Sequence, residues 1–291
     1  MWKAIKHILI FFGIQIVIIL PMLLLGRIVH TDRYLLMAIC MIIYSVLICL
    51  YVIRYGGIQL SKETFTMKSW AILLPYLFVP FLFATLIVLE DSVPVKLPNL
   101  ISRNFIKFAA SAPGLIAIGI FGPIGEEFLF RGAVLNSLLE WEKIKGKPWR
   151  AILLSAALFS LAHINPAQLP IAFTLGLLLG WLRCKTRSLM PGILIHCLNN
   201  SLICIVTILI VKQAGDEAIN ASETTSLPSA SGYLVAGIAL ILLAASIYFI
   251  IRTVNKHYPL PVPEPQTSAT PEPLPEPLPD ISLPEDRSDT E

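Results

Sequence analysis

Residues 122–139, GPIGEEFLFRGAVLNSLL, place two adjacent glutamates and an arginine inside sequence that is otherwise apolar. Ionisable side chains are costly inside a lipid bilayer, so a charge buried there usually has a function. The surrounding apolar stretch, residues 105–139, is long enough to cross a membrane with a break or a strong tilt. This stretch predicts a membrane protein that holds polar chemistry within its spans.

The composition of the whole chain supports the same class. Of the 291 residues, 56% are hydrophobic and 14% are charged, and the mean hydropathy is +0.75. Soluble domains carry about 25% charged residues. A spanning helix needs about 20 mostly apolar residues. Eight segments qualify: 5–26, 34–53, 70–89, 105–139, 150–166, 168–183, 189–211 and 231–251. We expect an all-α, polytopic transmembrane helical bundle of about eight spans.

The distribution of basic residues predicts the orientation of this bundle. With the N-terminus in the cytoplasm, the cytoplasmic segments carry 14 lysines and arginines and the opposite side carries 6. Basic residues concentrate on the cytoplasmic side of membrane proteins. We therefore expect a multi-pass protein of the plasma membrane with both termini in the cytoplasm.

Composition also divides the chain into four parts. Residues 1–104 hold N-terminal spans, 105–211 the core with the polar motifs, and 212–256 a loop and the last span. Residues 257–291 contain ten prolines and eight acidic residues. Such a sequence buries too little apolar surface to offset its ordering entropy, so this tail is predicted to be disordered with polyproline II character.

The first polar motif is Glu126-Glu127-x-x-x-Arg131. Gly122-Pro123 is predicted to end one helix and start another. Glu127 and Arg131 are then four residues apart on one helical face, in the order that favours pairing. Glu126 is rotated by about 100° from Glu127. We expect Arg131 to lock Glu127 in a structural pair and to leave Glu126 free as a general base.

Two further motifs lie in other predicted spans. Phe159 and His163 share a helical face near the end of the fifth span, and His196 and Asn200 share a face in the seventh. Counting along the spans places the two histidines at different depths, so a common site requires a tilted or irregular helix. With Glu126, these residues form a candidate site drawn from three spans.

Two chemistries fit this set. In one, Glu126 and His163 activate water while His196 and Asn200 donate hydrogen bonds to the developing oxyanion. In the other, Glu126, His163 and His196 hold a divalent metal such as zinc, which acidifies a bound water. The sequence contains neither an HExxH nor a GxSxG motif. It therefore favours water activation over a serine nucleophile and leaves the metal open.

The three motifs resemble the signature of the CPBP family of intramembrane proteases, which includes the type II CAAX prenyl proteases and the bacteriocin-processing or immunity (Abi) proteins. That signature reads EExxxR, FxxxH and HxxxN, and this chain shows all three in order within about residues 105–205. The run between the last two motifs is also similar to the family, at Gly176, Gly180, Trp181, Ser188, Leu189 and Pro191.

The resemblance implies a role for each matching residue. Glu126, His163, His196 and Asn200 would be catalytic, and Glu127, Arg131 and Phe159 would support them. Members of the family carry a metalloprotease label. Eukaryotic members remove a C-terminal tripeptide after a prenylated cysteine, whereas many bacterial members have no prenylated substrate.

Three functions are therefore distinguished, and an intramembrane endopeptidase is the leading one. It would cleave membrane-associated or lipidated substrates, in CAAX-type or bacteriocin-type processing. A non-catalytic immunity or scaffold protein would use the same helices to bind a partner, and a transporter would use the buried polar residues as an ion path. The expected partners are membrane lipid and a membrane-bound or lipidated peptide or protein, with no nucleic acid.

Overall fold

The computed structural model describes residues 1–25, 32–58, 60–70, 98–100, 103–221 and 230–258. These residues form helices and turns, with no strand among them, which confirms the all-helical prediction. Five helices within the described residues are long and apolar enough to cross a membrane: Trp2–Met22, Arg33–Tyr55, Ala112–Leu139, Pro166–Thr186 and Met190–Gln213. The chain is a helical membrane protein. The predicted span 70–89, part of the loop after residue 213 and the tail lie outside the described residues.

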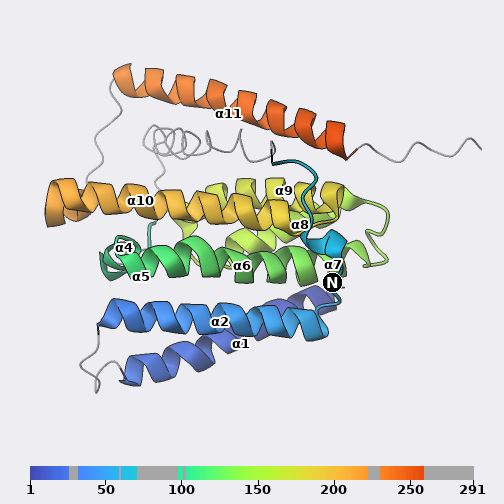
Figure 1. The fold of residues 1–291 in the computed structure, drawn as a ribbon, viewed down its shortest axis with the longest axis horizontal. Coiled ribbons are helices and arrows are strands. Elements are labelled where there is room, and N and C mark those ends of the chain that lie inside the picture. The colour runs from blue at the N-terminus through green and yellow to red at the C-terminus, as the bar shows by residue number, and fades with distance from the viewer. Residues whose placement is uncertain (26–31, 59, 71–97, 101–102, 222–229, 259–291) are drawn as a thin grey trace, which may run out of the picture. The chain divides into compact units, whose positions relative to one another are not determined.

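The first two helices, α1 (Trp2–Leu25) and α2 (Arg33–Tyr55), pack against each other (Figure 1). Asp32 caps α2, because its carboxylate accepts a hydrogen bond of 2.8 Å from the Tyr34 backbone N–H. Phe11 of α1 meets the ring of Tyr44 edge-on, with centroids 5.6 Å apart. This ring contact joins α1 to α2.

The central helix carries the two glutamates. Ser111 caps it by accepting from the Gly114 N–H at 3.1 Å. The chain then stays helical from residue 112 to residue 139 and changes only its type: α5 (Ala112–Ile116), the π-helix η4 (Ala117–Phe121), α6 (Gly122–Glu127), the π-helix η5 (Phe128–Val134) and α7 (Leu135–Leu139). A short separate helix, α4 (Arg103–Ala109), precedes it.

The predicted helix break at Gly122-Pro123 is wrong, because Phe121 and Gly122 both keep right-handed helical angles. A proline ring inside a regular α-helix clashes with the carbonyl four residues earlier. Here the wider π turn of η4 lies directly before Pro123 and gives the ring room. The change of helix type therefore replaces the break.

The helix α8 (Pro148–Leu161) is shorter than the predicted span 150–166. Its 14 residues measure about 21 Å, whereas the apolar core of a bilayer is about 30 Å thick. The helix ends before His163, and Ile164 takes a left-handed conformation with φ 52°. The chain therefore leaves α8 before His163, whose ring packs against Phe159 of the same helix.

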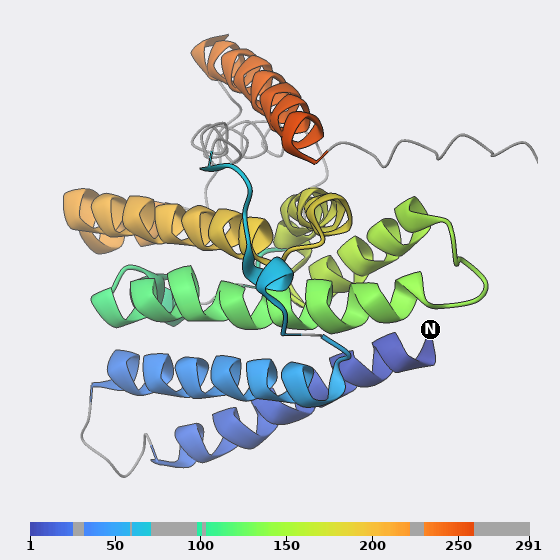
Figure 2. The same cartoon turned by 45° about the vertical axis from the view of Figure 1, so that its right-hand side comes forward.

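After α8 the chain continues through η6 (Pro166–Gln168) into α9 (Leu169–Thr186) and α10 (Met190–Ala221). Close approach of α8 and α9 depends on Gly176, where an added Cβ would lie 3.0 Å from Ala156. Small residues allow such approach between membrane helices. Figures 1 and 2 show α10 running alongside the central helix, which it contacts at η4 and α6.

Two further contacts complete the described fold. Ser188 starts α10, since its hydroxyl accepts from the Met190 N–H at 3.1 Å and donates to the carbonyl of Thr64 in the short helix η1 (Lys62–Phe65). The last helix, α11 (Ala230–His257), buries Ile250 and Val254 in an apolar cluster with residues of α9.

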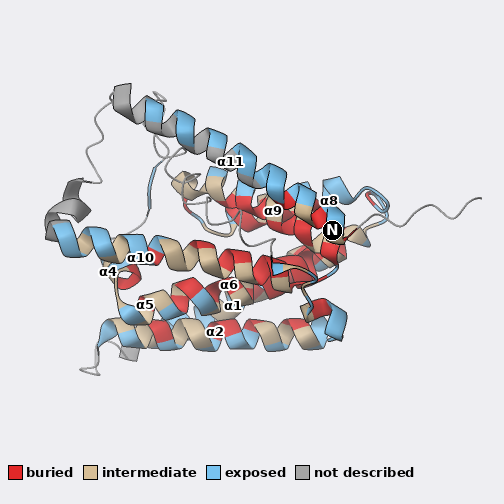
Figure 3. Cartoon of the chain, turned by 45° about the horizontal axis from the view of Figure 1, so that its top comes forward, coloured by how far each residue is buried: buried red, intermediate tan, exposed pale blue. Residues whose placement is uncertain are grey.

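The burial pattern is that of a protein in lipid (Figure 3). Large apolar side chains are exposed along α1, α2 and α10, whereas the central helix is the most buried of the five candidate spans. Buried charges lie on that central helix, where Glu127 is 0% and Arg131 is 1% exposed. The polar motifs therefore lie inside the bundle and away from the apolar outer faces.

Candidate active site

The core of the site is a buried ion pair between consecutive turns of the central helix. Arg131 donates from Nη1 to Glu127 Oε1 at 2.6 Å. Its Nη2 also donates to the Gly176 carbonyl of α9 at 3.3 Å. The pairing of Glu127 with Arg131 that the spacing predicted is confirmed, although η5 changes the helix type between them. Each charge offsets the cost of burying the other.

The same carboxylate also holds His196 of α10. The distance from His196 Nδ1 to Glu127 Oε1 is 3.0 Å, and the imidazole is 2% exposed. Glu127 Oε1, which also accepts from Arg131, is the acceptor in this contact, so Nδ1 carries the proton. The contact with Glu127 thus sets the tautomer of His196, and in the neutral ring Nε2 presents a lone pair.

Glu126 lies on the opposite side of this imidazole. Its Oε2 is 3.8 Å from His196 Nε2, and the side chain is 20% exposed. That oxygen is buried and has no hydrogen-bond partner among the described residues. The two neighbouring glutamates therefore face the two nitrogens of one ring: Glu127 binds it, and Glu126 stands off. The free carboxylate expected from the sequence has this geometry.

Phe159 joins the parts of the site that come from different helices. Its ring lies under the Arg131 guanidinium, with 4.5 Å from the guanidinium carbon to the ring centroid. The rings of His163 and His196 meet it edge-on, at centroid distances of 4.9 and 5.7 Å. Phe159 is 1% exposed. Both histidines therefore converge on one aromatic ring, despite the different depths that span counting assigned to them.

His163 is fixed by its own helix end. Its Nδ1 lies 2.9 Å from the Phe159 carbonyl, which can only accept, so Nδ1 carries the proton and Nε2 has the lone pair. Among the described residues, Glu126 makes its close histidine contact with His196 and none with His163. The structure thus links the free carboxylate to His196, while His163 lies at the other contact of Phe159.

Asn200 connects α10 to the π-helix η4. Its Nδ2 donates to the Ile118 carbonyl at 3.3 Å, and its Oδ1 accepts from Asn199 at 2.9 Å. The next residue, Ser201, extends this contact between the two helices, since its hydroxyl donates to the Gly119 carbonyl at 3.2 Å. A primary amide has two N–H donors, so Asn200 keeps one for a ligand.

The residue analysis missed Gly192, which sets how closely α10 approaches the carboxylates. A Cβ added there would lie 2.9 Å from Glu127 Oε2, closer than such contacts normally come. Gly192 directly follows Pro191 in the first turn of α10, and this Pro-Gly pair was the available signal.

The side chains of this site are of types that bind metals, but they are not arranged as three ligands around one point. Both histidines donate from Nδ1 to a fixed acceptor and leave Nε2 bare, as metal-binding histidines do. Catalytic zinc sites take three protein ligands. Within the described part of the chain, no three side chains of His, Cys, Asp or Glu come close enough to hold an ion.

Comparison with known proteins shows that the segment holding these residues matches a family model. Residues 108–202 match the family model described as type II CAAX prenyl endopeptidase Rce1-like. The resemblance to CAAX proteases is confirmed over that segment. It contains Glu126, Glu127 and Arg131, Phe159 and His163, and His196 and Asn200.

A curated relative agrees with this match. The membrane-embedded CAAX protease MroQ of Staphylococcus aureus is 30% identical over 108 residues, which cover 35% of this chain and 43% of the relative. The chain thus aligns with less than half of that relative's length. No solved structure matches the chain.

Proposed function

We propose that this protein is an intramembrane endopeptidase in which Glu126 activates the attacking water. The observation that carries the proposal is the buried Glu126 Oε2, which has no hydrogen-bond partner among the described residues and faces His196 Nε2 across 3.8 Å. One water oxygen can lie about 2.8 Å from both atoms. Because both are acceptors, such a water directs its two hydrogens at them and its lone pairs toward a substrate.

The reaction follows from these contacts. The water oxygen attacks the scissile carbonyl carbon, and Glu126 takes the proton that the water loses. The carbonyl oxygen becomes negatively charged and accepts the spare N–H of Asn200. When the carbon–nitrogen bond breaks, Glu126 returns the proton to the leaving amine. Water is consumed, and one carboxylic acid and one amine are formed.

The remaining residues hold this geometry. Arg131 and Glu127 fix the ring of His196 through Nδ1, so that Nε2 keeps its direction. Phe159 packs against both His196 and His163. The unprotonated Nε2 of His163 is a second acceptor next to the site. A preorganised polar group in a dry environment loses little energy to reorganisation during reaction.

The substrates that we propose are membrane-anchored or lipidated peptides and proteins. The site lies on helices whose outer faces are apolar, so a substrate reaches it most readily from the bilayer. The relative MroQ is a membrane-embedded CAAX protease, which agrees with processing close to a lipid anchor. The choice between CAAX-type and bacteriocin-type processing is part of the proposal's test.

The test is cleavage of a library of membrane-anchored and lipidated peptides by the full chain in nanodiscs, with products identified by mass spectrometry. Glu126→Gln should lower the initial rate by about 10²–10⁴-fold, the usual contribution of a general base. Glu142→Gln is the matched control, since that carboxylate is 82% exposed and lies outside the site. Thermal unfolding should be unchanged in both variants.

Two results would reject the proposal. In the first, Glu126→Gln cleaves as fast as wild type, which would remove the assigned base. In the second, the wild-type protein cleaves no peptide, and wild type and Glu126→Gln bind the same membrane partner. That result would favour a scaffold. Ion-coupled uptake that depends on Glu126 would favour a transporter instead.

A further inference from the structure

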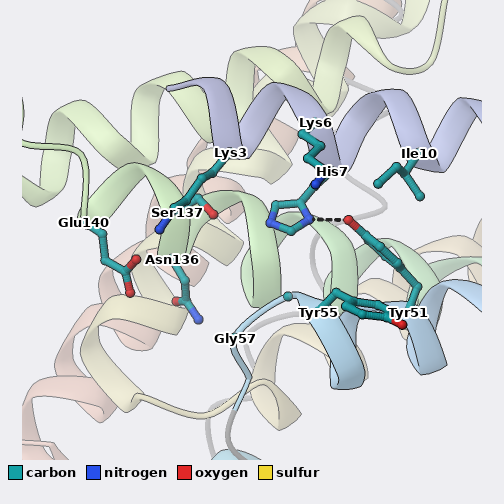
Figure 4. Close-up of a pocket in the computed structure, with 11 residues that line it drawn as sticks. Lys3, Lys6, His7, Ile10, Tyr51, Tyr55, Gly57, Asn136, Ser137 and Glu140 are labelled. Atoms are coloured by element: carbon teal, nitrogen blue, oxygen red, sulfur yellow. Dashed lines mark hydrogen bonds between the residues drawn. The ribbon is translucent and has the colours of Figure 1, made fainter.

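A second polar feature lies at the end of the bundle where α1 begins and α2 ends. It is a cavity of about 520 Å³ between these two helices and α7 (Figure 4). This volume is in the range of small-ligand sites. Polar side chains line it from all three helices, namely Lys3, Lys6, His7, Tyr51, Tyr55, Asn136 and Glu140.

The charge of this cavity is positive. Lys3 and Lys6 contribute two ammonium groups, and Glu140 contributes one carboxylate. None of the three forms an ion pair with another residue in the part of the chain that the structure describes. The two lysines are one helical turn apart on α1, so both can reach one ligand. An unneutralised pair of cations in a cavity favours an anion.

One wall of the cavity is rigid. His7 is 7% exposed and its Nδ1 lies 2.8 Å from the Tyr51 hydroxyl, the dashed line in Figure 4. The Tyr51 and Tyr55 rings are neighbours, with centroids 5.8 Å apart. On the other side, Asn136 adds an amide that can donate to an anion. The cavity is therefore built from three helices and does not depend on surface lysines alone.

The position of the cavity along the helices indicates its ligand. Trp2 is 71% and Tyr55 is 68% exposed. Amphipathic aromatic residues concentrate at the membrane–water interface, and both lie at helix ends beside the cavity. Arg54 lies over the Tyr55 ring at 5.5 Å. Lipid phosphates occupy this level of a bilayer, and basic pockets between spanning helices bind lipid head groups there.

We propose that this cavity binds the phosphate of an anionic phospholipid head group, with Lys3 and Lys6 as its cationic ligands. Asn136 supplies a neutral hydrogen bond, and Tyr51 and Tyr55 line the site where the acyl chains leave it. The lipid would connect α1 and α2 to the helix that carries Glu126. The proposal does not depend on protease activity.

The experiment uses the purified full chain in detergent and titrates short-chain phosphatidylglycerol, phosphatidylcholine and inorganic phosphate, with thermal unfolding as the readout. Phosphatidylglycerol should raise the unfolding temperature and phosphatidylcholine should not. Near a membrane, each lysine contributes about fivefold in affinity, so Lys3→Gln with Lys6→Gln should weaken apparent binding about 30-fold. Lys3→Arg with Lys6→Arg should retain it.

The matched control is Lys143→Gln with Lys145→Gln, which removes two cations outside the cavity. If this control weakens lipid binding equally, a diffuse surface charge explains the effect and the site is rejected. If inorganic phosphate stabilises wild type as well as phosphatidylglycerol does, the cavity is a site for a soluble anion and the lipid assignment is overturned. If the Lys→Gln pair binds phosphatidylglycerol normally, the lysines are not its ligands.

Discussion

Replacing Arg131 with methionine should destabilise the protein by removing one partner of a buried charge pair. The side chain is 1% exposed, and it donates to Glu127 at 2.6 Å and to the Gly176 carbonyl at 3.3 Å. A charge-assisted hydrogen bond contributes about 1.5–3 kcal/mol. The contact with Phe159 at 4.5 Å adds about 2 kcal/mol when desolvated. Methionine keeps much of the apolar packing.

These contributions indicate a loss of about 3–5 kcal/mol, the range found when one partner of a buried ion pair is removed. The cost arises mainly because Glu127 stays charged and buried without its arginine. Adding Glu127→Gln should therefore recover part of the loss, because glutamine still accepts from His196. We expect the double variant to cost about 2 kcal/mol less than the sum of the two single variants.

The assay is equilibrium unfolding in mixed micelles by a denaturing detergent, followed by the helical circular dichroism signal. Lys145→Met is the control, since its pair with Glu142 is exposed at 66% and 82% and should contribute about 0–1 kcal/mol. An Arg131→Met protein as stable as this control would refute the argument. Strict additivity of Arg131→Met and Glu127→Gln would refute the coupling.

Three other predictions concern the same site. Gly192→Ala should push against Glu127 Oε2, where the added Cβ would be 2.9 Å away; we expect a stability loss of about 1–3 kcal/mol by the same unfolding assay and a lower cleavage rate. Phe159→Leu removes the ring shared by the histidines and Arg131, so about 1–3 kcal/mol should be lost together with most peptide cleavage, whereas Leu153→Ala on the exposed face of α8 should retain it. Added chelator should leave the initial rate within about twofold, because among the described residues Glu126 and His196 belong to no group of three side chains that could hold an ion, whereas a catalytic zinc takes three protein ligands; a loss restored by zinc would contradict this.

Several features of the site could be predicted because they are local. The pairing of Glu127 with Arg131 follows from a four-residue spacing, which places both on one face of any helix with nearly regular turns. The separate environment of Glu126 follows from the rotation between neighbouring helical positions. Neither depends on how other helices pack.

Other features could not be predicted because they depend on packing between helices. The helix break expected at Gly122-Pro123 was replaced by a π turn, which accommodates the proline without ending the helix. Both histidines lie against the ring of Phe159, although span counting placed them at different depths. The contact of both glutamates with one imidazole depends on the approach of α10 at Gly192.

The sequence by itself determined an all-helical membrane protein and which polar residues it buries. Runs of apolar residues and helical spacing are short-range properties, and lipid leaves few alternatives to a helix for the backbone hydrogen bonds. The tertiary structure decided that His196 lies between Glu126 and Glu127, and that Phe159 joins α8, α10 and the central helix. Such distances depend on small residues at helix contacts and on where each helix ends, so they are settled only when the helices pack together.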